Sequence, residues 1–267
     1  MRFQPIFETV GHDGALSRRR GAHRGFAALV LLLALVAASP ASAFRLTPIV
    51  EDFQPTGREA VKNFTVTNTT PERIAVEIRM MKRAIRPDGQ EILAPEDKDF
   101  VVFPAQVALE PGKSQAVQVR WVGDPEPKTE LAYRIIAEQL PVELDKARQD
   151  IASIRLLIKY EGSVYILPKG AKADVSMTGL RPAKDADGKP GLQVTLVNKG
   201  LAHGIVREAK LALTDSAGGK VTLSGAAAKA LENINVLAGG TRNVVLPWPA
   251  GLKAGEVNGT LEAKVER

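Results

Sequence analysis

Few residues of this 267-residue chain have the types and spacing that catalysis requires. The chain holds no cysteine, which excludes disulfides, thiolate metal sites and cysteine nucleophiles. Only one of its three histidines, His203, lies beyond residue 43, and no Gly-x-Ser-x-Gly sequence precedes it to support a Ser-His-Asp arrangement. One imidazole without thiolates also does not make the usual zinc or copper site. We therefore interpret His203 as an ordinary loop residue and expect neither a metal nor a cofactor.

Acidic residues offer the remaining candidates for chemistry. Glu51 and Asp52 are adjacent, and Glu96, Asp97 and Asp99 form a second group. Paired carboxylates serve glycoside hydrolysis or calcium binding in other proteins. Here we interpret both groups as solvated loop charges. Since the chain also lacks a Gly-x-Gly-x-x-Gly or phosphate-loop motif, the sequence predicts a protein that is not an enzyme.

The first 43 residues have the features of a cleaved export signal. Arg18–Arg20 and Arg24 precede an apolar run over residues 26–38, and Ala41-Ser42-Ala43 follows with the pattern that a signal peptidase recognises. The apolar run is shorter than the roughly 20 residues that a permanent membrane helix needs. The Ala-Ser-Ala sequence favours cleavage over the alternative, an uncleaved N-terminal anchor.

The charge of the chain does not indicate a nucleic-acid partner. The formal net charge of +6 falls to +3 without the leader, because the leader holds five arginines and two acidic residues. Neither a block of basic residues nor a set of interleaved aromatics is present in the remainder.

Short stretches of alternating apolar residues from Phe44 to about Pro168 predict an antiparallel β-sandwich. Turn signals separate these stretches. Residues 100–103 are apolar throughout and are predicted to form a buried strand, whereas a helix is suggested only over residues 142–151. After Pro168 the composition shifts toward Ala, Gly and Lys, and strands are expected near residues 192–196, 205–213 and 257–265. We place the domains at 44–168 and 169–267, after the signal peptide 1–43.

Residues 99–141 carry a family resemblance. A Phe-Pro at 103–104, the sequence Leu-Glu-Pro-Gly-Lys-Ser-Gln at 109–115, a Val-Arg-Trp at 119–121 and a Tyr-Arg-Ile at 133–135 that leads to Leu-Pro at 140–141 occur in this order. Together they resemble the PapD-like periplasmic chaperones of chaperone–usher pilus assembly. The long end of the first domain, with Lys159-Tyr160, is closer to the archaic branch.

This resemblance implies two immunoglobulin-like domains in an L or boomerang arrangement, a location in the periplasm, and a partner. The partner is a pilus or fimbrial subunit that lacks its last strand, which the chaperone supplies from its own G strand before delivery to an outer-membrane usher. Residues 151–160 alternate as such a strand requires. The expected subunit-binding residues are Ile151, Ile154, Leu156, Leu157, Ile158 and Tyr160.

The sequence departs from the family pattern at the two positions that hold the terminal carboxylate of the subunit in well-known members. Pro48 and Ser163 stand where well-known members carry an Arg and a Lys. Nearby cations, Arg45 and Lys159, are the candidate anchors in their place.

Two functions from different classes remain open. One is an assembly chaperone without cofactors that caps a subunit, and whose apolar edge could also self-cap in a homodimer. The alternative is a stand-alone extracytoplasmic immunoglobulin-like module, structural or adhesive, without capping activity; the loss of the anchor cations at Pro48 and Ser163 favours it. The sequence does not identify the subunit, or decide between a pilus and a capsule-like fibre.

Overall fold

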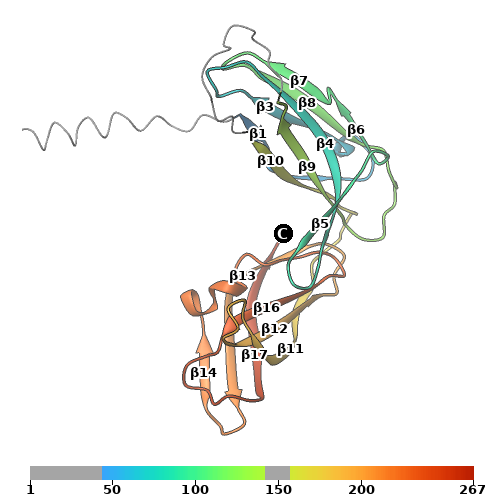
Figure 1. The fold of residues 1–267 in the computed structure, drawn as a ribbon. Coiled ribbons are helices and arrows are strands. Elements are labelled where there is room, and N and C mark those ends of the chain that lie inside the picture. Colours follow the sequence, from blue (N-terminus) through green and yellow to red (C-terminus); the bar gives the residue numbers. More distant parts are fainter. Residues whose placement is uncertain (1–43, 142–156) are drawn as a thin grey trace, which may run out of the picture. The chain divides into compact units, whose positions relative to one another are not determined.

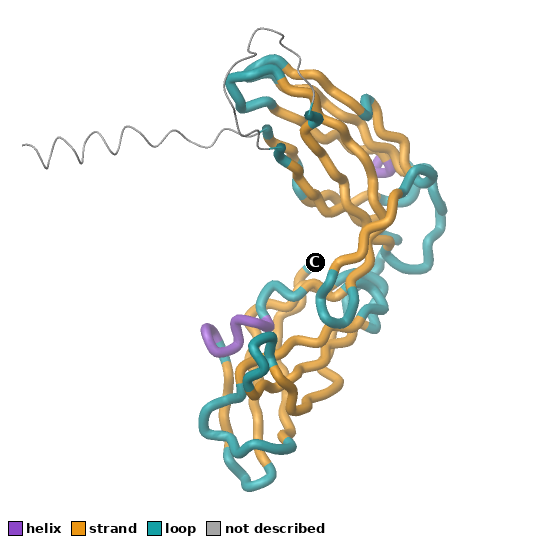
Figure 2. Tube along the Cα trace, in the orientation of Figure 1, coloured by secondary structure: helices purple, strands orange, loops and turns teal. Residues whose placement is uncertain are grey.

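The computed structural model describes residues 44–141 and 157–267. Residues 43–267 cluster as one compact unit. Strands and loops make up nearly all of the described chain (Figures 1 and 2), and the two short helical turns are η1 (Arg58–Ala60) and η2 (Gly225–Leu231). The predicted all-β class with two sandwiches is confirmed. The predicted helix over 142–151 lies outside the described residues.

The first sandwich packs two sheets against each other. One sheet has the order β1-β3-β8-β6, from β1 (Arg45–Thr47), β3 (Val61–Thr67), β8 (Ser114–Trp121) and β6 (Phe100–Phe103). The other has the order β2-β10-β9-β4-β5, from β2 (Val50–Phe53), β10 (Lys159–Ile166), β9 (Leu131–Gln139), β4 (Ile74–Ile85) and β5 (Glu91–Pro95), and β7 (Gln106–Leu109) also pairs with β4. Residues 45–53 are thus shared between both sheets, with Pro48 between β1 and β2.

The second sandwich is built in the same way from the remaining strands. Its first sheet is β11 (Val175–Lys184), β12 (Pro190–Asn198) and β16 (Thr241–Pro247). In its second sheet, β13 (Gly204–Asp215) pairs with β14 (Lys220–Leu223), β15 (Asn235–Val236) and β17 (Val257–Glu266). The strands that were expected near residues 192–196, 205–213 and 257–265 are therefore present.

The two sandwiches have separate cores of different chemistry. The first core is rich in aromatic rings, and Phe100 contacts Tyr133, Trp121 and Phe53 edge-on at centroid distances of 4.9, 5.0 and 6.1 Å. The fully buried part of the second core is formed by Leu, Val and Ala side chains. Alternation explains both cores, because every second residue of a strand faces inward.

A buried asparagine closes a corner of each sandwich. The Asn68 amide donates to the carbonyls of Glu72 and Leu109, and its Oδ1 accepts from the backbone N–H of Thr70. Asn198 repeats this pattern: its amide donates to the carbonyls of Ala202 and Val236, and its Oδ1 accepts from the N–H of Gly200. In each case one side chain satisfies backbone groups that the turning chain would otherwise leave unpaired.

The prediction that residues 100–103 form a buried strand is wrong in part. They form β6, but β6 lies at the edge of its sheet, where β8 is its one strand partner among the described residues. Phe100 faces the core, whereas Val101 is 51% exposed and Phe103 73% exposed. An apolar run therefore did not mean burial on both faces here.

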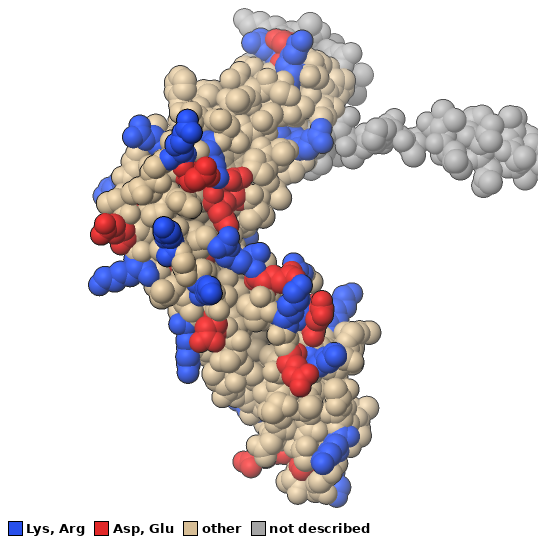
Figure 3. Space-filling model, turned by 180° about the vertical axis from the view of Figure 1, so that it is seen from behind, with Lys and Arg blue, Asp and Glu red and all other residues tan. Residues whose placement is uncertain are grey.

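Charged side chains of both signs are interspersed on the face of the molecule shown in Figure 3. No helix among the described residues is long and apolar enough to cross a membrane.

Candidate functional site: the half-paired strand β10

The strand β10 has two halves with different surroundings. It pairs antiparallel with β9 along its whole length, from Lys159 to Ile166. On its other side the parallel partner β2 reaches only residues 163–166. The first half of β10, residues 159–162, therefore has a strand partner on one side alone within the described parts of the chain.

Hydrogen bonds show which backbone groups face the unpaired side. The N–H of Ser163 donates to the carbonyl of Ile49 at 2.8 Å, so Ser163 directs its backbone toward β2. Ile158 directs its carbonyl the other way, toward the N–H of Gln139 at 3.0 Å. Because these directions alternate along a strand, Lys159 and Glu161 present their N–H and C=O groups to the unpaired side. Such a row of groups is a template for another strand.

Side chains along this half face both ways. Ile158 and Tyr160 pack against the first core, and the ring of Tyr160 meets Phe44 edge-on at 5.0 Å. Leu157 faces away from the core and is 45% exposed. The structure thus uses Ile158 and Tyr160 for the chain's own core and leaves Leu157 available. The other predicted subunit-binding residues, Ile151, Ile154 and Leu156, lie outside the described residues.

The two predicted carboxylate anchors lie at the surface. Arg45 is exposed on β1, and Lys159 is exposed at the start of β10. Lys159 also forms an ion pair within its own strand, because its Nζ lies 2.6 Å from the Glu161 carboxylate. Neither residue is brought to Ser163, where the resemblance places a cation.

A different cation binds Ser163. Arg134 lies opposite Ser163 on β9, and its Nη1 donates to the Ser163 hydroxyl at 2.6 Å. Glu91 accepts from Arg134 at 2.9 and 3.0 Å and from Arg83 at 2.6 Å. Although partial burial raises the pKa of the Glu91 carboxyl, Arg134 and Arg83 together hold it below its ordinary value. Two guanidinium groups share one carboxylate, so the cluster keeps a positive charge beside β10.

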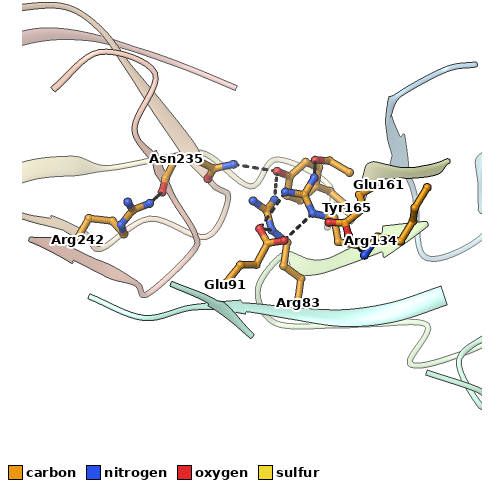
Figure 4. Close-up of polar contacts among 9 residues, drawn as sticks. Arg83, Glu91, Arg134, Glu161, Tyr165, Asn235 and Arg242 are labelled. Carbon is orange, nitrogen blue, oxygen red and sulfur yellow. Dashed lines mark hydrogen bonds and ion pairs between the residues drawn. The ribbon is translucent and has the colours of Figure 1, made fainter. Parts of the chain in front are cut away.

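Tyr165 links this cluster to the second sandwich. Its hydroxyl accepts hydrogen bonds from Arg83 Nη1 and from Asn235 Nδ2, both at 2.9 Å. Arg242 Nη1 in turn donates to the carbonyl of Asn235 at 3.0 Å (Figure 4). Burial and the nearby Arg83 charge lower the pKa of Arg242.

A pocket of about 520 Å³ lies beside the paired half of β10. It is lined by side chains from both sandwiches, which are Val50, Glu51, Asp52, Ser163, Tyr165, His203, Ile205, Asn235 and Arg267. Its wall is mixed in charge, since Arg267 pairs with Asp52 at 3.2 Å and Glu51 with Lys62 at 3.0 Å.

The interpretation of His203 as an ordinary loop residue is wrong. Its side chain is buried, and its Nδ1 lies 2.9 Å from both carboxylate oxygens of Glu130. Glu130 is 73 residues away in sequence and belongs to no motif, so the sequence held no signal for this pair. The predicted loop charges Glu51 and Asp52 also belong to the pocket. Among the residues that the structure describes, no group of three or more His, Asp or Glu side chains could hold a metal ion.

Comparison with known proteins supports the resemblance seen in the sequence. Residues 54–172 match the model of the pili and flagellar-assembly chaperone, PapD N-terminal domain. This match contains the motif region at residues 99–141 and all of β10, and it confirms the predicted resemblance to pilus chaperones. No curated protein matches the chain.

Three solved structures are similar over most of their length. The chaperone–tip adhesion subunit complex CsuC–CsuE of the archaic Csu pili of Acinetobacter baumannii is 16% identical, with a TM-score of 0.53 over 84% of this chain and 97% of that chain. A chaperone–tip adhesin complex of CFA/I fimbriae is 18% identical, with a TM-score of 0.51 over 84% and 98%. The class 5 fimbriae chaperone CfaA is 17% identical, with a TM-score of 0.50 over 84% and 100%. At these identities the similarity establishes the two-sandwich fold.

Proposed function

We propose that this chain is a periplasmic chaperone that binds a pilus or fimbrial subunit by lending it a strand and then delivers the subunit to an outer-membrane usher. The observation that carries this proposal is the half-paired β10: within the described parts of the chain, one side of residues 159–162 has no strand partner, and Leu157 is exposed. Two of the similar structures are complexes of a chaperone with a tip adhesin or tip adhesion subunit. The function is binding without catalysis.

The physical basis is completion of an unfinished sheet. A subunit that lacks a strand exposes unpaired backbone groups, which are costly out of water and prone to aggregation. A strand formed by residues 151–161 would satisfy these groups with its own outer N–H and C=O groups. If the alternation continues before residue 157, Ile151 shares the face of Leu157 and both would supply apolar side chains to the groove of the subunit, whereas Ile154 and Leu156 share the face of Ile158 and Tyr160.

An affinity purification of the tagged protein from the periplasm of its own host tests the proposal. We expect a small secreted β-rich protein to co-purify at equal stoichiometry. Leu157→Glu should abolish its recovery, because the substitution places a charge in the apolar groove. Val122→Glu is the matched control, since Val122 is likewise 45% exposed in the first sandwich but lies away from β10.

A wild-type protein that co-purifies with no other protein while fibres are being made would overturn the chaperone function. It would favour the alternative, a stand-alone immunoglobulin-like module, which the absence of cations at Pro48 and Ser163 also supports. Sedimentation of the purified protein separates a monomer from a homodimer that caps its own exposed edge. Recovery of an outer-membrane protein in the same purification would support the usher as the second partner.

The carboxylate of the subunit needs a cationic partner, and the proposal assigns this role to Arg45 and Lys159. Arg45→Ala with Lys159→Ala should weaken recovery of the subunit more at low salt than at high salt, because exposed ion pairs are screened. If this double variant binds normally while Arg134→Gln does not, the cation next to Ser163 is the anchor instead.

Export can be tested on the same material. N-terminal sequencing of the periplasmic protein should give Phe44 as its first residue. A protein that retains residues 1–43 in the membrane fraction would contradict cleavage.

A further inference from the structure

An ion pair lies on the open half of β10. The Nζ of Lys159 is 2.6 Å from the Glu161 carboxylate, and the two side chains are 49% and 33% exposed. They share the face that is turned away from the first core, because Tyr160 between them packs against that core. Both residues also direct their backbone groups to the side of β10 where the described chain has no strand partner. Any strand that pairs there therefore lies beside both charges.

The strand on the paired side gives Glu161 no opposite charge directly across. Glu161 lies opposite Ile136 of β9, which is 2% exposed. Arg134, two residues before Ile136, is diagonal to Glu161, and its guanidinium binds Glu91 and the Ser163 hydroxyl. Within the described parts of the chain, Glu161 thus has its ion pair with the lysine two residues before it.

Lys159 lies opposite an acidic residue whose charge is already paired. This residue is Glu138 of β9, and its carboxylate accepts from Arg79 Nη2 at 2.6 Å. The proposed function places the carboxylate of the subunit at Lys159, and that carboxylate would compete with Glu161 for the ammonium group. The added strand would at the same time cover Glu161 further, and a carboxylate that is removed from water without a compensating charge is costly. Glu161 then needs a cation from the subunit.

A paired strand places its own side chains next to these two charges. Side chains directly opposite each other on neighbouring strands have Cβ atoms about 4.5–5.5 Å apart, so opposite charges stabilise the pair and like charges destabilise it. A shift of the partner strand by one residue turns its side chains to the other face. A shift by two residues restores the face but brings its charges to the wrong neighbours. Two opposite charges two residues apart therefore favour one register.

We propose that Lys159 and Glu161 set the register of the subunit strand on β10, and that this strand carries a cationic side chain beside Glu161, two positions from the acidic group beside Lys159. A subunit with an acidic side chain beside Glu161 is rejected, because like charges lie next to each other. This inference rests on the proposed function, since it describes the partner of the same strand.

Exchange of the two charges tests the proposal on the whole exported chain. Lys159→Glu with Glu161→Lys keeps an ion pair and the net charge, but reverses the order of the charges that a partner meets. It should bind the subunit that co-purifies with the wild type roughly tenfold more weakly at about 50 mM salt, with a smaller difference at about 500 mM. The matched control is Lys264→Glu with Glu266→Lys, a pair two residues apart on β17 with 2.5 Å between its charged atoms, which should bind as wild type.

A change in the subunit separates recognition from an effect on the fold. Glu161→Lys alone should also bind roughly tenfold more weakly. A subunit whose cationic residue is replaced by Glu should bind Glu161→Lys better than it binds the wild type. A loss that came only from the stability of Glu161→Lys would not be relieved by a change in its partner. If Glu161→Lys does not fold, Glu161→Gln should bind more weakly and with a smaller salt dependence than the wild type.

Equal binding by the wild type and the charge-exchanged variant at low salt would overturn the proposal. Recovery of the subunit by the wild type in that experiment would still support the proposed function. If the wild type recovers no subunit, the proposed function fails, and the proposal for Lys159 and Glu161 fails with it.

Discussion

The first sandwich and the second turn their chains with the same device and fill their cores with different residues. Asn68 and Asn198 each bond to the carbonyl four residues ahead and to the N–H two residues ahead. Four residues before each asparagine lies a fully buried side chain, Phe64 in the first sandwich and Val194 in the second. The two corners therefore satisfy their backbone hydrogen-bonding groups in the same way, whereas the side chains that fill the two cores differ in size.

The sandwiches also differ in how their last strands are paired. In the second sandwich β17 runs beside β13 from residue 257 to residue 266. In the first sandwich β10 acquires a second neighbour only over residues 163–166. Among the described strands β17 pairs with β13 alone, so its other side is open along its whole length, whereas β2 closes the open side of β10 over half of its length.

The largest effects should come from the unequal cores. Phe64→Ala should lower the free energy of unfolding by about 4 kcal/mol, and Val194→Ala by about 2 kcal/mol, because the smaller residue leaves a smaller cavity. Urea denaturation of single-tryptophan versions measures each sandwich separately, with Trp121 in the first and Trp248 in the second. Equal losses for the two variants would contradict the unequal filling of the cores.

The two matching corners should give equal losses of stability, which lie between the losses expected for the two core variants. Asn68→Ala leaves two carbonyls and the N–H and hydroxyl of Thr70 without this partner, and Asn198→Ala leaves two carbonyls and the N–H groups of Gly200 and Asp174. Each variant should therefore lose about 3 kcal/mol. The Trp121 signal should report the first loss and the Trp248 signal the second. If Asn68→Ala shifts both signals together, the sandwiches unfold as one unit and the comparison must be made on the whole chain.

A smaller difference between the two sandwiches is expected in how the free energy of unfolding depends on pH. Because the pKa of Glu91 is lower in the folded protein than in the unfolded chain, Glu91 stabilises the fold at neutral pH, and this stabilisation is lost as the pH falls through the lowered pKa. Glu91→Gln should therefore flatten the acid limb of the unfolding free energy below about pH 5. Glu256→Gln, at an exposed position of the second sandwich, serves as the control and should leave the acid limb unchanged. An unaltered acid limb in Glu91→Gln would show that Arg83 and Arg134 do not stabilise the carboxylate.

The smallest effect is expected at the exposed edge of the first sandwich. Val101→Thr and Phe103→Ser should change stability by no more than about 0.5 kcal/mol, because both side chains face away from the core. Thermal unfolding of these two variants beside Phe100→Ser, which should be strongly destabilising, checks the alternation along β6. A large loss in Phe103→Ser would mean that this ring is covered in solution.

Alternation was sufficient to predict most strands, because each sheet has one face on a core and one face outward. The motif region at 99–141 was sufficient to predict the chaperone resemblance. Alternation could not show that residues 100–103 form an edge, since edge position depends on which strand pairs next to them. The contacts of His203 with Glu130 and of Ser163 with Arg134 were equally hidden, because they join residues far apart in the sequence. Arg134 belongs to the Tyr-Arg-Ile motif, but the motif does not show which residue its side chain contacts.

The pairing of β2 with β10 sets the order in which the strands of the first sandwich can pair during folding. Val50 finds its partner Ser163 only 113 residues later in the chain. Synthesis makes the N-terminal part first, so β2 lacks its partner strand while more than a hundred residues follow. Strand β10, which is proposed to protect a partner from premature association, is thus itself among the last strands to reach its own sheet. Until β10 is in place, the first sandwich lacks a strand and needs the same protection as the proposed partner.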